Sequence, residues 1–435
     1  MVFELPALRR VRGMRDFLPK EAQIMKYIEG KARKIARLYE YGEIITPVLE
    51  SYELLAAKAG EEIRSRMYAF EDLGGRKVAL RPEFTASVAR LVATTLRNEP
   101  KPLRMFSVGS LYRYDEPQQG RFREFWQSNY ELMGSSKPEA DAEIIMLTNN
   151  LMKAAGLKNC VFRVGHVGVL RRILSQEKVE DKVQNRIMQL MDKKEYDDAL
   201  ELVEATGVSE KCLMALQKLV KVKGNKFSEV LNEMEGLVED YESAVDAVRN
   251  LREVLELVSE SGERIDIMVE AGFARGLEYY TGMIFEPYVP EMNMALGGGG
   301  RYDKLIELFG GEPTPAVGVA HGIDRIMLAM QKQKATLKTK EEKTVAVIPI
   351  KEKLKGEALK ISRMLRDADI LVEVEVMGRK VAKALEDADR RNIDYAIIVG
   401  EREMREGAVV VRNLGEREQK TVKIERIVGQ IKGQN

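Results

Sequence analysis

The sequence predicts an α/β protein: a large α+β domain, with a mainly antiparallel sheet flanked by helices and a helical insertion, precedes a small C-terminal α/β domain. Residues 103–134 have the pattern of two strands joined by a tight turn, the unit of an antiparallel sheet. Residues 167–261 are charged, helical in pattern and poor in Gly and Pro. From Thr344 onward, short β-branched runs alternate with helical segments. The 435 residues are enough for two or three domains.

The composition is typical of a globular protein without a strong overall charge. Hydrophobic residues make up 45% of the chain and charged residues 32%, and the formal net charge is +1. A nucleic-acid surface would therefore have to come from local patches. Cys160 and Cys212 lie far apart and predict no disulfide framework. No apolar run approaches the ~20 residues of a membrane span, and the first residues lack a signal-peptide core. We expect a cytoplasmic protein without membrane contact.

The small number of histidines limits the chemistry. His166 and His321 are not paired closely with the cysteines, so no metal site is predicted. Neither histidine lies beside the serine elbow motif of hydrolases. Arginine, carboxylate and tyrosine remain, and these residues favour catalysis by positioning and charge neutralisation.

The first elements are a helix and a strand that contains proline. From Glu21 to about Tyr41, apolar residues recur on one helical stripe. Residues 43–51 predict a strand, which Pro47 restricts to an edge or an interface. An amphipathic surface helix beside an edge strand would give the same pattern. The predicted stripe comprises Ile24, Ile28, Ile35 and Leu38.

A hairpin and a helix follow. Residues 68–70 and 77–80 predict two strands around a Gly-Gly turn, and a helix begins near Thr85, whose hydroxyl is expected to cap it. Glu83 and Thr85 place a carboxylate and a hydroxyl at the mouth of a sheet. This pair suits an α-ammonium group, although an ordinary strand-to-helix connection would look the same.

The central hairpin, residues 103–134, carries the most informative face. Alternate strand residues point to opposite sides, so the even positions, with the large apolar groups, are expected to face a core. Arginines suit a polyphosphate, an aromatic ring suits a stacked base, and amides with a carboxylate suit a small polar ligand. A solvated sheet face is the alternative. The odd face after the turn at 117–120 comprises Arg121, Arg123, Phe125, Gln127, Asn129 and Glu131, and Arg113 on the first strand can join it.

Two further stretches follow a helix predicted at 140–157. The string RGLEYYTG occupies residues 275–282. The four glycines at 297–300 would destabilise an ordinary strand, so they indicate either a backbone that a ligand approaches closely or a flexible turn. Residues 315–331 predict a strand that enters a helix, with Arg325 in the first turn.

The C-terminal part begins after a polar, lysine-rich linker at 331–343. Strand–helix alternation then predicts a small α/β domain. Its expected strands are residues 344–350, 370–376, 395–400 and 408–414, and its expected helices are residues 354–368 and 378–392.

The central hairpin resembles motif 2 of the class II aminoacyl-tRNA synthetases. In that motif an arginine and an acidic residue precede the turn, and an arginine and a phenylalanine follow it. Many members have glutamate at the acidic position, whereas here an aspartate is followed directly by a glutamate, so either carboxylate is a candidate contact to ATP. Arg325 resembles the arginine of motif 3, and the helix and strand at 21–51 resemble motif 1, a dimer-forming element. The matching hairpin positions are Arg113, Asp115 or Glu116, Arg121 or Arg123, and Phe125.

Three strings make the resemblance more specific. LRPEFTASVAR, RGLEYYTG and GGGRYD are similar to segments of histidyl-tRNA synthetases, and the chain is identified as a member of that family. The resemblance implies a catalytic core in two parts around an insertion that contacts the acceptor arm of tRNA, and an anticodon-binding domain after a linker. The implied boundaries are 1–166 and 262–330 for the core, 167–261 for the insertion, 331–343 for the linker and 344–435 for the last domain.

The family activates L-histidine with ATP to give histidyl-adenylate and pyrophosphate, and then transfers the histidyl group to the 3′ end of tRNA(His). The resemblance therefore implies ATP, Mg²⁺, L-histidine and tRNA(His) as ligands, and a homodimer. Arg275 and Arg113 are the expected catalytic residues, and Gln118 and Gln119 at the turn are expected to meet the tRNA. The implied histidine site comprises Glu83, Thr85, Arg113, Gln127, Glu131, Arg275, Tyr279 and Tyr280. The implied ATP site comprises Arg113, Asp115, Glu116, Arg121, Arg123, Phe125 and Arg325.

Three other functions fit part of the pattern. A non-catalytic paralogue from histidine metabolism would usually lack the C-terminal domain and degrade the RGLEYYTG string. A class II synthetase for another amino acid would not keep Glu131 together with Tyr279 and Tyr280. A nucleotide-binding interaction protein would not charge tRNA.

Overall fold

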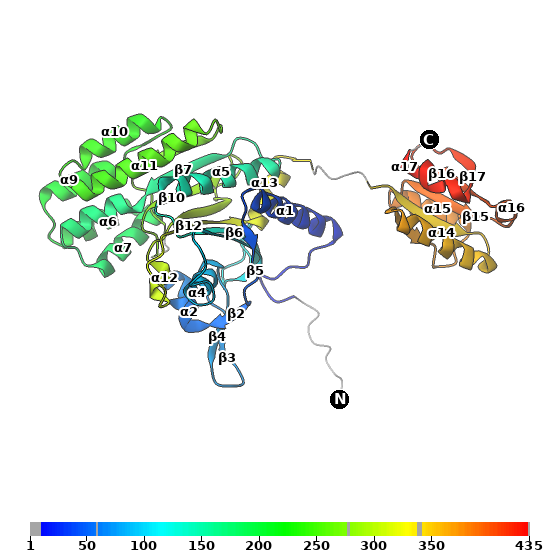
Figure 1. The fold of residues 1–435 in the computed structure, drawn as a ribbon, viewed down its shortest axis with the longest axis horizontal. Coiled ribbons are helices and arrows are strands. Elements are labelled where there is room, and N and C mark those ends of the chain that lie inside the picture. The colour runs from blue at the N-terminus through cyan, green and yellow to red at the C-terminus, as the bar shows by residue number, and fades with distance from the viewer. Residues whose placement is uncertain (1–9, 58–59, 276–278, 337–341, 434–435) are drawn as a thin grey trace. The chain divides into compact units, whose positions relative to one another are not determined.

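The computed structural model describes residues 10–57, 60–275, 279–336 and 342–433. The chain divides into two compact units, Met1–Leu337 and Lys338–Asn435. Each unit has its own sheet and its own hydrophobic core (Figure 1).

A nine-stranded sheet forms the centre of the first unit. Its strands are β1 (Gly42–Glu43), β5 (Leu103–Tyr112), β6 (Glu124–Met133), β7 (Val161–His166), β8 (Lys223–Gly224), β9 (Asp266–Glu270), β10 (Met283–Tyr288), β11 (Gly297–Arg301) and β12 (Ala316–Gly322). Their order is β1-β5-β6-β12-β11-β10-β7-β9-β8. The pairs β1–β5 and β7–β9 are parallel, whereas the other neighbours are antiparallel. The predicted fold class, with its mainly antiparallel sheet, is confirmed.

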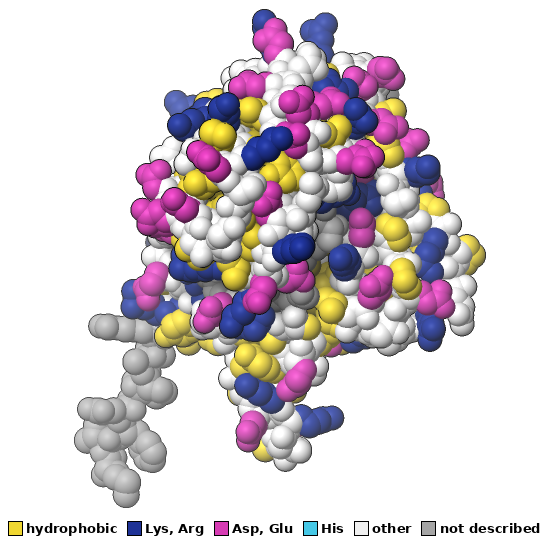
Figure 2. All heavy atoms as spheres, turned by 90° about the vertical axis from the view of Figure 1, so that its left-hand side faces the viewer, with side chains coloured by type: hydrophobic (Ala, Val, Ile, Leu, Met, Phe, Trp, Pro, Cys, Tyr) yellow, Lys and Arg dark blue, Asp and Glu magenta, His cyan; other side chains and the backbone are white. Residues whose placement is uncertain are grey.

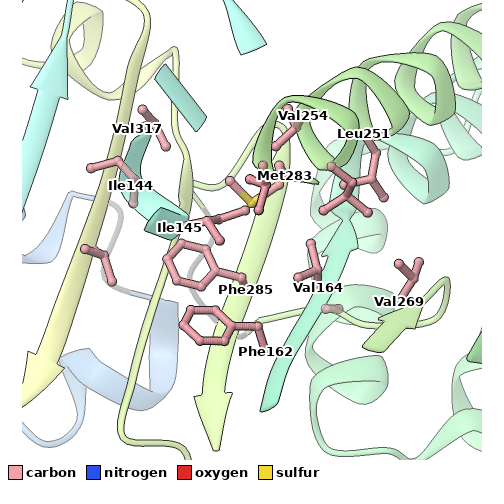
Figure 3. Packing of buried hydrophobic residues seen from close by; sticks show 14 of the residues in the cluster. Ile144, Ile145, Phe162, Val164, Leu251, Val254, Val269, Met283, Phe285 and Val317 are labelled. Carbon is pink, nitrogen blue, oxygen red and sulfur yellow. The ribbon is translucent and has the colours of Figure 1, made fainter. Parts of the chain in front are cut away.

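Helices flank this sheet. They are α1 (Pro19–Leu38), α2 (Tyr52–Ala56), α3 (Gly60–Arg64), α4 (Thr85–Ala93), α5 (Pro138–Ala154), α6 (Val167–Gln176), α7 (Asp181–Asp192), α8 (Tyr196–Ala205), α9 (Glu210–Leu219), α10 (Phe227–Leu237), α11 (Glu242–Glu260), α12 (Leu305–Leu308) and α13 (Ile323–Lys332). Figure 3 shows side chains of α5 and α11 meeting those of β7 and β10 in the main core. Phe162 and Phe285 stack there with ring centroids 6.1 Å apart. Burying such large apolar side chains stabilises the fold by about 1.5–3 kcal/mol each.

The helix predicted from Glu21 is α1, and its apolar stripe is only partly as expected. Ile28 and Ile35 are buried, whereas Leu38 is 67% exposed. Ten residues separate Leu38 from Ile28, which at 3.6 residues per turn rotates it well away from the buried face.

The single strand predicted at 43–51 was wrong. β1 ends at Glu43 and belongs to the central sheet, whereas β2 (Leu49–Ser51) pairs with β4 (Lys77–Leu80) in a separate small sheet that also contains β3 (Ala69–Glu71). Pro47 lies between the two strands. Proline has no backbone N–H to donate to a ladder, so it marks the point where the chain leaves one sheet for the other.

The segment between β7 and β9 contains the helices α6 to α11, as its charged pattern predicted, together with the short strand β8. β8 pairs with β9, so this segment also adds the last strand of the central sheet. On the side of the first unit that carries these helices, positive and negative side chains are interspersed (Figure 2). This arrangement is typical of a solvated surface.

The second unit is a five-stranded sheet with the order β14-β13-β15-β16-β17. Its strands are β13 (Thr344–Pro349), β14 (Leu371–Val374), β15 (Tyr395–Val399), β16 (Ala408–Asn413) and β17 (Gln419–Lys423). Its helices are α14 (Lys355–Asp367), α15 (Val381–Arg390), α16 (Glu401–Arg405) and α17 (Ile427–Lys432), with 3₁₀ turns at Glu352–Leu354 and Ile424–Arg426. The sequence pattern predicted the first four strands and missed β17, whose residues QKTVK contain only one buried side chain.

A buried ion pair fastens α5 to the central sheet. The Arg301 guanidinium, on β11, donates to both carboxylate oxygens of Asp141, on α5. The two side chains are 7% and 0% exposed. Removing one member of such a pair leaves an uncompensated buried charge.

We therefore expect Asp141→Ala to lower the free energy of unfolding of the first unit by about 3–5 kcal/mol. Lys226→Ala is the control, because the Lys226–Glu229 pair is 78% and 69% exposed and such pairs contribute about 0–1 kcal/mol. Urea unfolding followed by circular dichroism measures both variants. A loss for Asp141→Ala no larger than the control's would contradict the proposed anchoring.

Candidate active site

A cavity of about 590 Å³ lies against the central strands β6, β11 and β12. Most of the residues predicted for the site line it. From the histidine set they are Glu83, Thr85, Arg113, Gln127, Glu131, Arg275, Tyr279 and Tyr280. From the ATP set they also include Asp115, Arg121, Phe125 and Arg325.

The structure places two residues of the predicted ATP set outside this cavity. Arg123 is buried elsewhere: its Nε donates to the Asp115 carbonyl at 3.2 Å, and its guanidinium lies 3.7 Å from the centre of the Tyr114 ring. Glu116 is exposed and forms an ion pair with Arg12 at 2.7 Å. The expectation of one odd-numbered face was wrong at Arg123, because β6 begins only at Glu124 and the strand alternation does not extend before it. Gln118 and Gln119 are exposed at the turn.

Glu131 is the most enclosed acidic group of the cavity, with 2% of its surface exposed. Its Oε1 accepts hydrogen bonds from the Thr85 hydroxyl at 2.8 Å and from the Asn129 amide at 2.6 Å, and its Oε2 accepts from the Tyr302 hydroxyl. Burial raises the pKa of Glu131 to about 7, although these three donors favour the charged form. The carboxyl group is thus held in one orientation and titrates near neutral pH.

The helix cap predicted at Thr85 was wrong. Phe84 is the N-cap residue of α4, and no side chain caps that helix. The Thr85 hydroxyl bonds to Glu131 instead. A residue that looked like local helix chemistry therefore belongs to the cavity.

The glycine run at 297–300 forms β11, so the flexible-turn alternative was wrong. A Cβ atom at Gly298 would lie 1.4 Å from Nη1 of Arg275. On the neighbouring strand β12, a Cβ at Gly318 would lie 1.7 Å from Oε2 of Glu131. A Cβ at Gly298 would displace the Arg275 guanidinium, and a Cβ at Gly318 would displace the Glu131 carboxylate and also lie 2.8 Å from the Tyr130 carbonyl oxygen.

Arg275 lies against the cavity with Nη1 3.2 Å from Glu286 and its guanidinium 5.7 Å from the centre of the Tyr280 ring. A purely structural arginine at this position would pair with a carboxylate near it in the sequence, Glu270 or Glu278. Glu270 pairs with Arg163, and residues 276–278 lie outside the described residues. The partner that the structure does show, Glu286, is also part of the cavity wall.

Glu83 and Arg113 form another part of the cavity wall. Tyr279 donates to Glu83 at 3.3 Å, and Nε of Arg113 donates to the Pro82 carbonyl at 2.9 Å. Burial raises the pKa of Glu83 and lowers that of Arg113, while the charge of each opposes the shift in the other. The site therefore holds opposite charges that are little screened by water.

An aromatic ring and further arginines line another part of the cavity. The Arg113 guanidinium lies 5.3 Å from the centre of the Phe125 ring. Arg325, at the start of α13, donates to the Ala295 carbonyl at 2.8 Å. Asp115 pairs with Arg66 at 3.1 Å, and Arg121 is exposed. These groups can stack a base and bind phosphate oxygens.

A segment near the N-terminus supports these residues, and the sequence analysis assigned it no role. Arg15 forms an ion pair with Asp324, whose other oxygen accepts from the Trp126 backbone N–H at 2.7 Å. Phe17 packs edge-on against Trp126, with ring centroids 5.4 Å apart. These contacts tie residues 15–17 to β6 and to the start of α13.

Asn129 lies in the cavity with Gln127 and Glu131, on the hairpin face that the sequence predicted. Tyr302 and Glu286 also line the cavity but were not singled out from the sequence. Tyr302 lies within the GGGRYD string and so had a readable signal, whereas Glu286 lies in the stretch MIFEPY, which has none. From the helical segment, residues 192–194 also line the cavity.

Over the described residues, no cluster of His, Cys, Asp or Glu could hold a metal ion by itself. The same residues contain no helix long and apolar enough to cross a membrane.

Comparison with known proteins identifies both units. Residues 13–326 match the family model described as Histidyl-tRNA synthetase, and residues 344–434 match the model described as Anticodon binding domain. The histidine–tRNA ligase of Methanocaldococcus jannaschii is 43% identical over 96% of this chain and 98% of its own length. That of Pyrococcus furiosus is 37% identical over 97% and 98%.

Solved structures share the fold. A Bacillus halodurans protein described as an ATP phosphoribosyltransferase regulatory subunit/histidyl-tRNA synthetase has a TM-score of 0.76 and 27% identity, covering 90% of this chain and 98% of its own. The histidyl-tRNA synthetase of Nostoc sp. PCC 7120 has a TM-score of 0.79 at 22% identity, covering 100% of both chains. With the family model matched over most of its length and curated relatives above 40% identity end to end, this chain belongs to the histidyl-tRNA synthetases, a class II family of aminoacyl-tRNA synthetases.

Proposed function

We propose that the cavity is where this histidine–tRNA ligase activates L-histidine with ATP and then transfers the histidyl group to the 3′ end of tRNA(His). The observation that carries the proposal is the placement of Glu131, a hydrogen-bonded buried carboxylate, in the same cavity as Arg113, Arg275 and Phe125. Such a cavity can select an imidazole and hold the phosphates and base of ATP beside it.

The histidine pocket is assigned to Glu131 and its neighbours. The Glu131 carboxylate accepts from one imidazole N–H, and a hydroxyl of Tyr279 or Tyr280 serves the other nitrogen. The α-ammonium group is bound by the Glu83 carboxylate and by the Thr85 hydroxyl oxygen, which can still accept a hydrogen bond while it donates to Glu131. Gln127 lies beside the bound histidine. A pocket built on hydrogen bonds rejects a side chain that cannot pair, by roughly 10⁴-fold or more.

The ATP pocket is assigned to the arginines and Phe125. Arg113 and Arg275 hold the α-phosphate and the histidine carboxylate, which attacks it in line, and neutralise charge in the transition state. Arg121 and Arg325 hold the outer phosphates, and adenine lies between Phe125 and the Arg325 guanidinium. We assign Arg121 and not Arg123 because only Arg121 lines the cavity.

Mg²⁺ is proposed as the metal that accompanies ATP. Oxygen ligands from phosphates and one or two carboxylates suit this ion. Asp115 and Glu286 line the cavity and would supply those carboxylates. Asp115 is preferred to Glu116, which lies outside the cavity in an exposed ion pair.

ATP–pyrophosphate exchange with each of the twenty amino acids tests the function directly. Exchange is expected with histidine alone, followed by charging of tRNA(His). Exchange with a different amino acid, or none with any, would contradict the proposal.

Two parts of the chain are proposed to contact tRNA. Gln118 and Gln119, exposed at the turn between β5 and β6, are proposed to meet the end of the acceptor stem, and the unit that begins near residue 344 is proposed to read the anticodon. The catalytic core is proposed to comprise residues 1–166 and 262–330, with residues 167–261 as its insertion and 331–343 as the linker.

Cytoplasmic location is proposed because tRNA charging supplies translation and both cysteines are free.

A homodimer is proposed from exposed apolar residues near α1 and the segment that follows it. Leu38, Ile45 and Leu49 are 67%, 93% and 41% exposed, and such exposure is typical of a contact surface. Closed two-fold dimers are the commonest assembly. Sedimentation at micromolar protein is expected to give one species of twice the chain mass, and a fully active monomer would contradict the proposal.

The role of Arg275 predicts a specific kinetic defect. Arg275→Lys keeps the charge but loses the planar fork, so kcat for pyrophosphate exchange is expected to fall by roughly 10²-fold or more with little change in KM. Arg249→Lys, on the exposed surface of α11, is the control and should keep wild-type rates. Near-normal kcat in Arg275→Lys would remove this arginine from the transition state.

The pKa of Glu131 predicts the pH dependence of histidine use. The productive complex needs Glu131 ionised and the substrate imidazole neutral, and their pKa values are about 7 and about 6.5. Below both values, log(kcat/KM) for histidine should fall with a slope approaching two, because two protons must be lost. In Glu131→Gln only the substrate imidazole still titrates. The acidic side of the plot of log(kcat/KM) against pH should therefore have a slope near one, and KM for histidine should be higher than in the wild type. A slope of two in the variant would show that Glu131 is not the titrating group.

A further inference from the structure

A second cavity of about 400 Å³ adjoins the first. Arg163, Lys194, Tyr288 and Asn293 line both cavities, so the two share a wall. We name this second cavity the side chamber. Its volume lies within the range of about 300–1,000 Å³ typical of small-ligand sites.

The side chamber carries a surplus of positive charge. Of the residues that the structure describes, three cations and one carboxylate, Glu270, line the chamber. Glu270 pairs with Arg163, lies opposite Lys223 in the β8–β9 ladder and accepts a hydrogen bond from Tyr196 at 3.2 Å. Lys194, in the turn between α7 and α8, and Lys223, on β8, are both exposed and line the chamber. Among the described residues, neither lysine has a carboxylate within ion-pair distance, whereas many other surface lysines of the chain do. The lining therefore attracts an anion.

The rest of the chamber wall is apolar. Val161, Met268 and Val289 contribute from β7, β9 and the residue after β10. Two ammonium groups beside an apolar wall match a nucleotide, which combines a phosphate with a ring that packs on apolar or aromatic surfaces. A free inorganic anion would gain nothing from the apolar side.

We propose that the side chamber holds a nucleotide of the single-stranded 3′ end of the tRNA, with its phosphate on Lys194 and Lys223 and its base or ribose against the apolar wall. The proposal rests on the proposed function, because it adds a position for the third substrate. Histidine and ATP are already assigned to side chains in the main cavity. The tRNA end must reach that cavity with its last nucleotides unpaired, and unpaired nucleotides present both phosphates and open ring faces to a protein.

Two substitutions test the chamber. Lys223→Glu reverses one charge on an exposed side chain that lies opposite Glu270 in the β8–β9 ladder, so its circular dichroism is compared with that of the wild type. Lys194→Gly removes the other ammonium at a residue whose φ is +63°, a conformation that glycine adopts without strain. Lys221→Glu is the matched control, because Lys221 is exposed two residues before Lys223 and does not line the chamber.

For Lys223→Glu and Lys194→Gly, we expect KM for tRNA(His) in aminoacylation to rise about tenfold, as for a lost contact of 1.4 kcal/mol. In Lys223→Glu, whose side chain lines the side chamber and not the main cavity, ATP–pyrophosphate exchange should stay within twofold of wild type, since it needs no tRNA. Lys194→Gly should also reduce the slope of log KM against log salt by about 0.7, the value for one phosphate contact to a single strand. Lys221→Glu should match wild type in every assay.

A second measurement locates the contact on the tRNA. The wild-type protein and Lys223→Glu should bind tRNA(His) that lacks its last three nucleotides with equal affinity, because the proposed contact is then absent from both complexes. A penalty that persists with the shortened tRNA would overturn the assignment to the 3′ end.

Equal tRNA kinetics in all three variants would also overturn the proposal. Impaired pyrophosphate exchange in Lys223→Glu would instead place ATP or pyrophosphate in the chamber. Failure of the proposed function is distinguishable from these results, because it would abolish histidine-dependent exchange in the wild-type protein itself.

Discussion

The site depends on glycines in two neighbouring strands, Gly298 in β11 and Gly318 in β12. Gly318 lies opposite Glu131 in the β6–β12 ladder and opposite Gly300 in the β11–β12 ladder. Glycine within a strand costs roughly 0.5–1 kcal/mol relative to alanine. The sheet tolerates several because it is wide and because α5 and α11 bury its other apolar groups. The charged groups of the cavity can then lie directly on the backbone in the middle of the sheet, where any Cβ would displace them.

Once charges lie there, each needs a partner. Glu131 is satisfied by hydroxyl and amide donors rather than by a cation, which leaves it able to accept from an uncharged ligand. Arg275 and Glu286 balance one another instead. Arg15, Asp324 and the Trp126 backbone form a chain of contacts that joins the N-terminal segment, β6 and α13. The two elements that carry Phe125 and Arg325 are therefore held in a common register.

Much of the fold was readable in the sequence because its signals are local. The hairpin of β5 and β6 has alternating side chains and a turn of proline and glycine, and the C-terminal strands are β-branched runs. The division of residues 43–51 between two sheets was not readable, because strand partners are set by distant segments. Thr85 was read wrongly as a helix cap, because a hydroxyl that caps a helix and one that bonds to a cavity carboxylate have the same local sequence signal. Arg123 was assigned to the wrong face because side chains alternate between the two faces of a sheet only within a strand, and β6 begins one residue later, at Glu124. Glu286 and Arg15 acquire their roles through contacts with residues far along the chain, and no spacing rule reveals them.

The helical segment between β7 and β9 leaves and rejoins the sheet at adjacent strands, because Val161 pairs with Asp266 in a parallel ladder. Because the ladder is parallel, the segment leaves at the last residue of β7, His166, and rejoins at the first residue of β9, Asp266, so its two ends lie about one strand length apart, roughly 17 Å. A segment attached in this way can gain or lose helices over evolution without altering the order of the catalytic strands. Its own contribution to the cavity, residues 192–194, can therefore differ between lineages while the residues that the central strands contribute stay the same.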